Sequence, residues 1–187
     1  IAEPVQGAGG VIIAPGTYWP EVRRVLEKYD ILLVMDEVIC GFGRTGKWFG
    51  NIFYGMKPDL MTFAKAVTNG YQPLGGVMVG ERVAEVPAGD HTIFIGREFG
   101  HGFTYSGHPA ACAAGLATLK ILREEKVIEN VESVTGPHLA RRWAELADHP
   151  LVGEARTLGL FGALELVKDK ATRERFAPGG RAGSVCR

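Results

Sequence analysis

The hydrophobic and polar positions of the chain follow strand-like and helix-like patterns in turn. The run from Ile31 to Met35 is apolar at every position and stops abruptly at Asp36–Glu37. An uninterrupted run of this kind is typical of a strand that is covered on both faces in a parallel sheet. Further runs of mostly apolar residues at 60–64 and 76–79 predict two further strands.

Three other stretches have the spacing or the composition of helices. Residues 19–28 place apolar side chains on one face and charges on the other. A series of good helix formers extends over 109–123 and has Pro109 in its first turn, where proline is favoured. A third helix is predicted over 127–146. The alternation of strands and helices favours an α/β layered domain.

The pattern changes near residue 151, directly after the pair His149–Pro150. Residues 157–166 read as one new strand. We therefore predict a domain boundary here, with 1–150 in a first domain and 151–187 at the start of a second.

The composition of the chain argues against several classes of partner and site. Its 21 basic and 21 acidic side chains leave no net charge that would attract nucleic acid or a membrane surface. No apolar run approaches the ~20 residues that span a bilayer. The three cysteines are odd in number and widely spaced, which argues against a disulfide framework and favours the cytoplasm. Because the chain starts at Ile1 and stops at Arg187 inside unfinished patterns, we expect a fragment of a longer protein.

Two charged side chains stand at the carboxyl ends of neighbouring predicted strands. Asp36 follows the first apolar run, and Lys65 follows the run that ends at Phe63 and Ala64. Ligands bind at this end of the strands in α/β sheets. A lysine partly removed from water suits imine formation, and a carboxylate opposite it could keep a ring nitrogen protonated. The same spacing fits a strand-end salt bridge without a catalytic role, and both interpretations stay open at this point.

A glycine-rich stretch over 41–48 differs by one residue from a phosphate-binding P-loop. Trp48 stands where that loop requires the magnesium-binding hydroxyl, and the residues after Lys47 are a poor start for a helix. We therefore reject a nucleotide triphosphatase.

Four separate motifs, in order and about thirty residues apart, resemble those of the class III aminotransferases. They are EPVQGAGG at 3–10, DEV followed by GFGRTG within 36–46, FAKA at 63–66 and GFTYSGHP at 102–109. The resemblance covers most of the chain. It implies fold type I of the pyridoxal-phosphate enzymes, an α/β fold. Residues 1–150 would be part of the large cofactor-binding domain, a mostly parallel sheet with flanking helices. Residues 151–187 would begin the small C-terminal α+β domain.

The resemblance also assigns roles to individual residues. Lys65 would bind pyridoxal 5'-phosphate as a Schiff base and later move the proton at the substrate carbon, while Asp36 would pair with the pyridine nitrogen. Val38 would pack on the face of the ring. Thr104, with the backbone of Phe103, would bind the cofactor phosphate, usually across a homodimer interface with shared active sites. A hydroxyl in a glycine-rich turn ahead of a helix is a reasonable anion site, although an ordinary strand threonine is the alternative.

Two positions depart from the pattern of the members that are specialised for amino acids. Many of those members carry a glutamate where this chain has Ala8 and a glutamine where it has Ile39. The chain is therefore more similar to the ω-amine:pyruvate and polyamine aminotransferases. They move an amino group from an amine or ω-amino acid to an oxo acid such as pyruvate by a ping-pong mechanism. His91 and His101 are expected to be surface or hydrogen-bonding residues.

Other functions remain compatible with the same motifs. An aminomutase or a pyridoxal-phosphate decarboxylase would use the same scaffold and the same lysine. In a third interpretation the 187 residues are an inactive, dimerising piece, because the second phosphate loop and the substrate-binding arginine of the family are not found in them.

Overall fold

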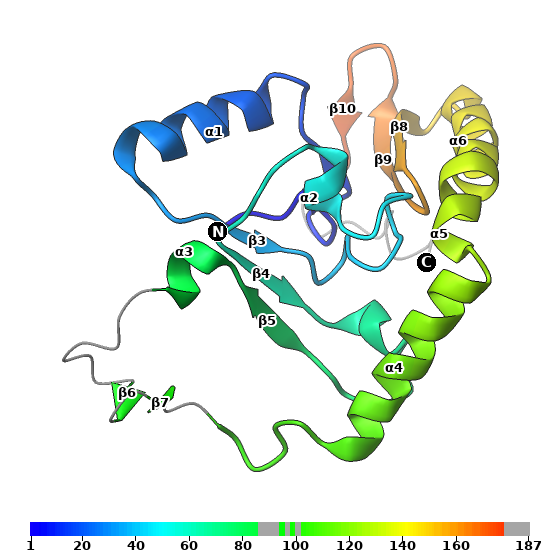
Figure 1. Cartoon of the computed structure of the whole chain (residues 1–187). Helices are drawn as coiled ribbons and strands as arrows, with labels where there is room; N and C mark the ends of the chain where they lie inside the picture. Colours follow the sequence, from blue (N-terminus) through cyan, green and yellow to red (C-terminus); the bar gives the residue numbers. More distant parts are fainter. Residues whose placement is uncertain (86–93, 96–97, 100–101, 178–187) are drawn as a thin grey trace.

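A computed structural model describes residues 1–85, 94–95, 98–99 and 102–177, and Figure 1 shows their arrangement. A three-stranded sheet lies near the middle, in the order β3 (Val34–Asp36), β4 (Leu60–Phe63) and β5 (Gly76–Val79). The main helices, α1 (Tyr18–Tyr29) and α4 (Pro109–Glu124), confirm the predicted helices closely. The shorter elements are β1 (Val5–Gln6), β2 (Ile12–Ile13), α2 (Gly50–Phe53), η1 (Lys65–Val67), α3 (Glu81–Ala84), β6 (Phe94–Ile95) and β7 (Glu98–Phe99). His91 and His101 lie outside the described residues.

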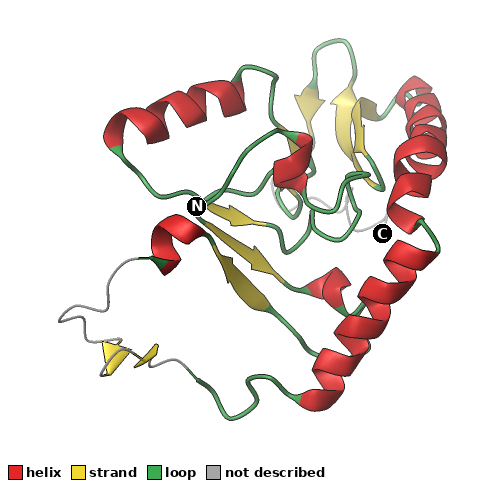
Figure 2. Ribbon diagram, viewed as in Figure 1, coloured by secondary structure: helices red, strands yellow, loops and turns green. Residues whose placement is uncertain are grey.

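The strands β3 and β4 run parallel, with Val34 opposite Leu60 and Asp36 opposite Thr62. The strand β5 pairs with β4 in the antiparallel direction. A parallel partner usually needs a crossover helix, but the connection from β4 to β5 contains only the short turn η1. The carboxyl ends of β3 and β4 therefore meet at one edge of the sheet, from which loops continue (Figure 2).

The first predicted strand is shorter than the sequence suggested. Ile31 and Leu32 are each 46% exposed, so the prediction of a strand covered on both faces over 31–35 is wrong for these two residues. They follow the end of α1, where Asp30 adopts a left-handed conformation and the amide of Ile31 donates to the carbonyl of Leu26 at 3.0 Å. Backbone groups that close a helix in this way do not pair in a sheet.

One part of the core forms between α1 and the sheet. Trp19, Leu33, Met35 and Met56 make one buried cluster, on which the apolar face of α1 packs. A second buried cluster, of Val5, Val11 and Cys40, contacts apolar side chains from the C-terminal part of the chain. The two clusters fix the strand end at Asp36 between them, because Met35 and Cys40 are both fully buried.

The helix predicted over 127–146 is one helical stretch with an irregular centre. It consists of α5 (Val127–Asn130), the π-helical turn η2 (Val131–Thr135), α6 (Gly136–Glu145) and the short η3 (Leu146–Asp148). Pro137 explains the π turn, because it has no N–H to donate and its ring crowds the preceding turn. In the part of the chain described here, no helix has both the length and the apolar character that a membrane span requires.

The residues after Pro150 form a hairpin of β8 (Val152–Leu158) and β9 (Phe161–Asp169), which β10 (Glu174–Arg175) extends. The prediction of a single strand over 157–166 is wrong, since the chain reverses at Gly159–Leu160. Gly159 adopts a φ of 58°, the left-handed conformation that two-residue hairpin turns favour. The domain boundary near residue 150 stays a prediction.

This hairpin packs against the glycine-rich loop 41–48. The amide of Leu160 donates to the carbonyl of Arg44 at 2.9 Å. A Cβ atom on Gly159 would lie only 2.2 Å from the same carbonyl oxygen, so glycine is required by space as well as by conformation. Lys47, at the end of the loop, pairs with Glu132, and no helix begins until Gly50. These features agree with the rejection of a P-loop.

Candidate active site

Asp36 is the last residue of β3 and is half-buried. Its Oδ1 accepts two hydrogen bonds, from the amide of Val38 at 3.1 Å and from the hydroxyl of Thr62 at 3.0 Å. Among the residues that the structure describes, none donates to Oδ2. One oxygen of the carboxylate is therefore held in place while the other is available to a ligand.

Lys65 follows the end of β4 by two residues and opens the turn η1. Its φ of 46° is left-handed, which costs a non-glycine residue about 1–3 kcal/mol and occurs preferentially at functional sites. The turn is anchored on its far side, because Val67 and Thr68 are buried and the hydroxyl of Thr68 donates to the carbonyl of Gln72 at 2.6 Å. The strained backbone at Lys65 is thus imposed by a well-packed turn.

The side chain of Lys65 differs from the expectation in two respects. It is exposed, so the described residues do not remove it from water. It also forms no ion pair with Asp36 or with any other residue in the described part of the chain, so the expected charged pair is not formed. The reason is the backbone path, since the chain bends into η1 at Lys65 and does not continue the line of β4 beyond Phe63.

Val38 is half-buried, and its amide donates to the carboxylate of Asp36. The next residue, Ile39, packs against Gly7: a Cβ atom there would lie 2.4 Å from Ile39 Cδ1. The loop 7–10, which contains Ala8, therefore covers Ile39 directly.

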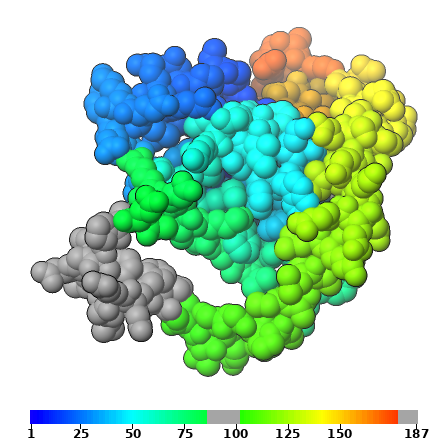
Figure 3. All heavy atoms as spheres, in the orientation of Figure 1, coloured from blue at the N-terminus to red at the C-terminus, as the bar shows by residue number. Residues whose placement is uncertain are grey.

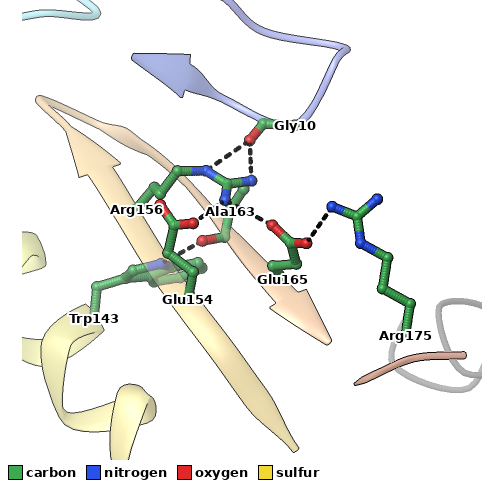
Figure 4. Close-up of polar contacts among 7 residues, drawn as sticks. All are labelled: Gly10, Trp143, Glu154, Arg156, Ala163, Glu165 and Arg175. Atoms are coloured by element: carbon green, nitrogen blue, oxygen red, sulfur yellow. Dashed lines mark hydrogen bonds and ion pairs between the residues drawn. The ribbon is translucent and has the colours of Figure 1, made fainter. Parts of the chain in front are cut away.

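The same loop is held from its other side by the C-terminal hairpin, as Figure 4 shows. Arg156 donates from Nε and Nη2 to the carbonyl of Gly10, at 3.3 and 2.9 Å. Its Nη1 forms ion pairs with Glu154 at 3.0 Å and with Glu165 at 3.2 Å, and Arg175 in turn pairs with Glu165. Arg156 thus fixes the loop between the hairpin and the segment that follows Asp36.

Thr104 and Phe103 lie in the exposed turn 102–108 ahead of α4, a segment that is drawn in green at the lower edge of Figure 3. The amide of Phe103 donates to the hydroxyl of Ser106 at 3.0 Å, and the amide of Ser106 donates back to the carbonyl of Phe103. Phe103 and Tyr105 are 75% and 81% exposed. The structure therefore brings Asp36, Val38 and the Lys65 turn to one edge of the sheet, while no hydrogen bond between described residues joins Thr104 to Asp36 or Lys65.

A cavity of about 520 Å³ opens beside Asp36, and its other walls come from residues within 1–19. Of the residues expected in the site, only Asp36 lines it. Val38, Lys65, Phe103 and Thr104 therefore do not share this cavity with Asp36.

Sequence reasoning missed two residues that shape the site. Thr62 is one, and Glu37 is the other: its side chain is fully buried and accepts from the amides of Gly50 at 2.8 Å and Asn51 at 2.6 Å. Burial raises the pKa of Glu37, although the two backbone hydrogen bonds act in the opposite direction. A polar residue directly after an apolar run carries no signal for such a role, because the partners are backbone amides.

Replacing Glu37 with glutamine should change how stability depends on pH. Because the folded pKa of Glu37 is raised, the folded protein keeps a proton over a pH range in which the unfolded chain has lost it. The unfolding free energy should therefore fall as the pH rises through this range, by at most about 1.4 kcal/mol per pH unit, and the variant should lack this fall. Urea unfolding of the full-length protein between about pH 4 and pH 8 measures it.

The matched control is Glu21→Gln, because Glu21 is exposed and, among the described residues, pairs only with Arg24 on the surface of α1. This variant should keep the pH dependence of the wild type. Equal slopes for the wild type and the Glu37 variant would contradict the prediction.

Comparison with known proteins assigns this arrangement to a family. The sequence profile described as "Aminotransferase class-III" matches residues 1–186. A putrescine–pyruvate aminotransferase of Pseudomonas aeruginosa is 60% identical over 187 residues, which are all of this chain and 40% of that protein. A diaminobutyrate–2-oxoglutarate transaminase of Halomonas elongata is 50% identical over 98% of this chain and 39% of its own length.

Solved structures agree with the sequence comparison. An (S)-enantioselective omega-transaminase from Thermomicrobium roseum superposes with a TM-score of 0.85 at 50% identity, over 95% of this chain and 38% of that one. The chain thus spans about two fifths of the length of these relatives. It has the fold of the corresponding part of a fold type I transaminase. The chain belongs to the class III aminotransferase family.

Proposed function

We propose that the full-length protein transfers an amino group from a terminal amine, such as a diamine or an ω-amino acid, to a small oxo acid such as pyruvate. Pyridoxal 5'-phosphate would be its cofactor, as in its family. The observation that carries the proposal is the pair of strand ends. Asp36 presents one free carboxylate oxygen, and Lys65 presents an exposed amine on a strained backbone, at the same edge of a parallel strand pair.

The chemistry of these side chains fits the cofactor. Bound pyridoxal phosphate supplies an electron sink for charge that develops at the substrate carbon. Lys65 would hold the cofactor through its amine and then carry the proton to and from that carbon. Asp36 would keep the ring nitrogen protonated through its free oxygen, and Val38 would pack on the ring.

The exposed turn at 102–108 supports a homodimer with shared sites. Thr104 forms no hydrogen bond with Asp36 among the described residues, and the aromatic residues beside it are open to solvent. The helix α4 also exposes large apolar side chains, with Leu116 68% and Ile121 50% exposed. A second copy that covers these side chains would bring its own Thr104 toward the first copy's site, in line with the expected phosphate contact.

The substrate class rests on Ala8, Ile39 and the relatives. A buried arginine that is left unpaired costs several kcal/mol, which is why a nearby glutamate is useful where two acidic substrates alternate. Ala8 cannot take that role, and Ile39 adds an apolar wall under the loop 7–10. The name of the 60% identical relative combines a diamine donor with pyruvate, which supports the same choice here.

A kinetic comparison of putrescine, β-alanine and 4-aminobutyrate, each with pyruvate and with 2-oxoglutarate, tests the proposal. We expect turnover of the diamine and at least about tenfold higher kcat/KM with pyruvate, since a tenfold ratio corresponds to only about 1.4 kcal/mol. A clear preference for 2-oxoglutarate without turnover of putrescine would refute the substrate class. The absence of any amino transfer would refute the activity.

Product analysis separates the alternatives on the same scaffold. A decarboxylase or an aminomutase would consume its amino-acid substrate without an oxo-acid acceptor, whereas an aminotransferase converts the amine and the oxo acid in equal amounts. The cytoplasmic location and the inactivity of the isolated 187 residues stay predictions.

A further inference from the structure

The strand β4 contributes to both halves of the proposed site. Its Thr62 stands directly opposite Asp36 in the parallel register, and Lys65 follows three residues later on the same segment. The hydroxyl of Thr62 donates to Asp36 Oδ1 at 3.0 Å, and the backbone carbonyl of Thr62 accepts from the amide of Glu37 at 3.0 Å. One residue therefore holds both the side chain of Asp36 and the backbone that follows it.

Without the hydroxyl, the carboxylate of Asp36 would keep one donor, the amide of Val38 at 3.1 Å. That amide belongs to the same short segment as Asp36, so it moves with the carboxylate when the segment moves. Thr62 is different because it lies on the neighbouring strand, whose Leu60–Phe63 backbone is paired on both sides. It is the contact that orients the carboxylate relative to the strand that leads to Lys65.

We infer that Thr62 is a positioning residue for the proposed reaction, which fixes Asp36 so that Oδ2 faces the ring nitrogen of the cofactor. The inference rests on the proposed function. Thr62 touches neither substrate nor cofactor; it acts through Asp36. A hydrogen bond to a charged group is among the stronger ones in proteins, so its loss has a measurable effect.

The expected signature is a change in the pH dependence of the bound cofactor. A protonated ring nitrogen withdraws electrons from the bond to the lysine and makes the lysine nitrogen less basic. When Asp36 is less well oriented, the ring nitrogen loses its proton more easily, and the lysine nitrogen becomes more basic. The pH at which the absorbance of the bound cofactor changes therefore rises.

The test uses the full-length protein reconstituted with pyridoxal phosphate, as the wild type and as Thr62→Val, Thr62→Ser and Thr118→Val. In Thr62→Val we expect the absorbance transition to shift to higher pH. The dissociation constant of the cofactor should increase about tenfold. Thr62→Ser keeps the hydroxyl and should restore both values. Thr118 is a buried threonine whose hydroxyl donates within α4, to the carbonyl of Ala114, so its replacement should change neither.

The melting temperature of each protein without cofactor separates orientation from folding. A Thr62→Val protein with the absorbance transition and the cofactor affinity of the wild type overturns the inference and leaves the proposed function intact. The same is true if Thr62→Ser is as impaired as Thr62→Val at an equal melting temperature. A wild-type protein that gains no cofactor absorbance at all overturns both.

Discussion

Replacing Lys65 with alanine should reduce aminotransfer by about 10⁴-fold or more, because one side chain supplies both the bond to the cofactor and the proton transfer. The fold should survive, since the lysine side chain is exposed and forms no hydrogen bond or ion pair with the described residues. Alanine tolerates the left-handed backbone at φ 46° no better and no worse than lysine does. The unfolding free energy should therefore change by no more than about 0.5 kcal/mol.

The measurement combines turnover with chemical mapping. Borohydride reduction of the cofactor-loaded wild type should leave the cofactor on the peptide that contains Lys65, and the variant should give no such peptide. Lys47→Ala is the matched control, because Lys47 is the lysine of the glycine-rich loop and is already paired with Glu132. Label on Lys47 or Lys57 in the wild type would overturn the assignment of Lys65.

Replacing Asp36 with asparagine should lower kcat by about 10²–10³-fold, a loss of the size found when one preorganised polar group is removed from a catalytic site. Asparagine has the same shape and can still accept from Val38 and Thr62 through its carbonyl oxygen. Only the negative charge at the free position is lost, so the ring nitrogen should no longer stay protonated. Steady-state kinetics with saturating oxo acid, together with the absorbance of the bound cofactor, measure this.

A second aspartate of the same sheet provides the control. Asp59 precedes β4, and its Oδ2 accepts from the amide of Leu33 at 2.7 Å. Asp59→Asn should lower the melting temperature without changing the absorbance of the bound cofactor. Near-normal turnover of the Asp36 variant would mean that this carboxylate has a structural role only.

Regular elements with local signals were predictable from the sequence. The helices at 18–29 and 109–124 agree with their apolar spacing and with the proline at the first turn of the second. The errors arose where a short feature changes the chain direction. Ile31 belongs to a helix end, and Gly159 turns an apparent strand into a hairpin. Both runs of apolar residues exist, but one left-handed residue decides how the backbone hydrogen-bonds there. That residue is Asp30 at the end of α1 and Gly159 in the hairpin turn.

The positions of Asp36 and Lys65 at the strand ends could be predicted from the sequence, but the residues that contact them could not. The positions of Asp36 and Lys65 at neighbouring strand ends follow from where the apolar runs stop, and the structure agrees. The role of Thr62 depends on the register of two strands, and that of Glu37 on a backbone segment thirteen residues away. Neither relation leaves a trace in local periodicity. The exposure of the Lys65 side chain depends equally on tertiary packing.

The hydrogen bonds from Arg156 to the carbonyl of Gly10 join positions that are 146 residues apart in the sequence. This separation has a consequence for folding in the cell. Contacts of such long range form late, because the entropy of closing the loop is lost before the contact stabilises it. At a synthesis rate of about 5–20 residues per second, Arg156 is added roughly 7–30 seconds after Gly10. During that time the loop 7–10 lacks its outer support while Ile39 is already in place. Ribosome-bound chains that end before β8 should therefore have a readily cleaved peptide bond near Gly10, and chains that include the hairpin should be protected there.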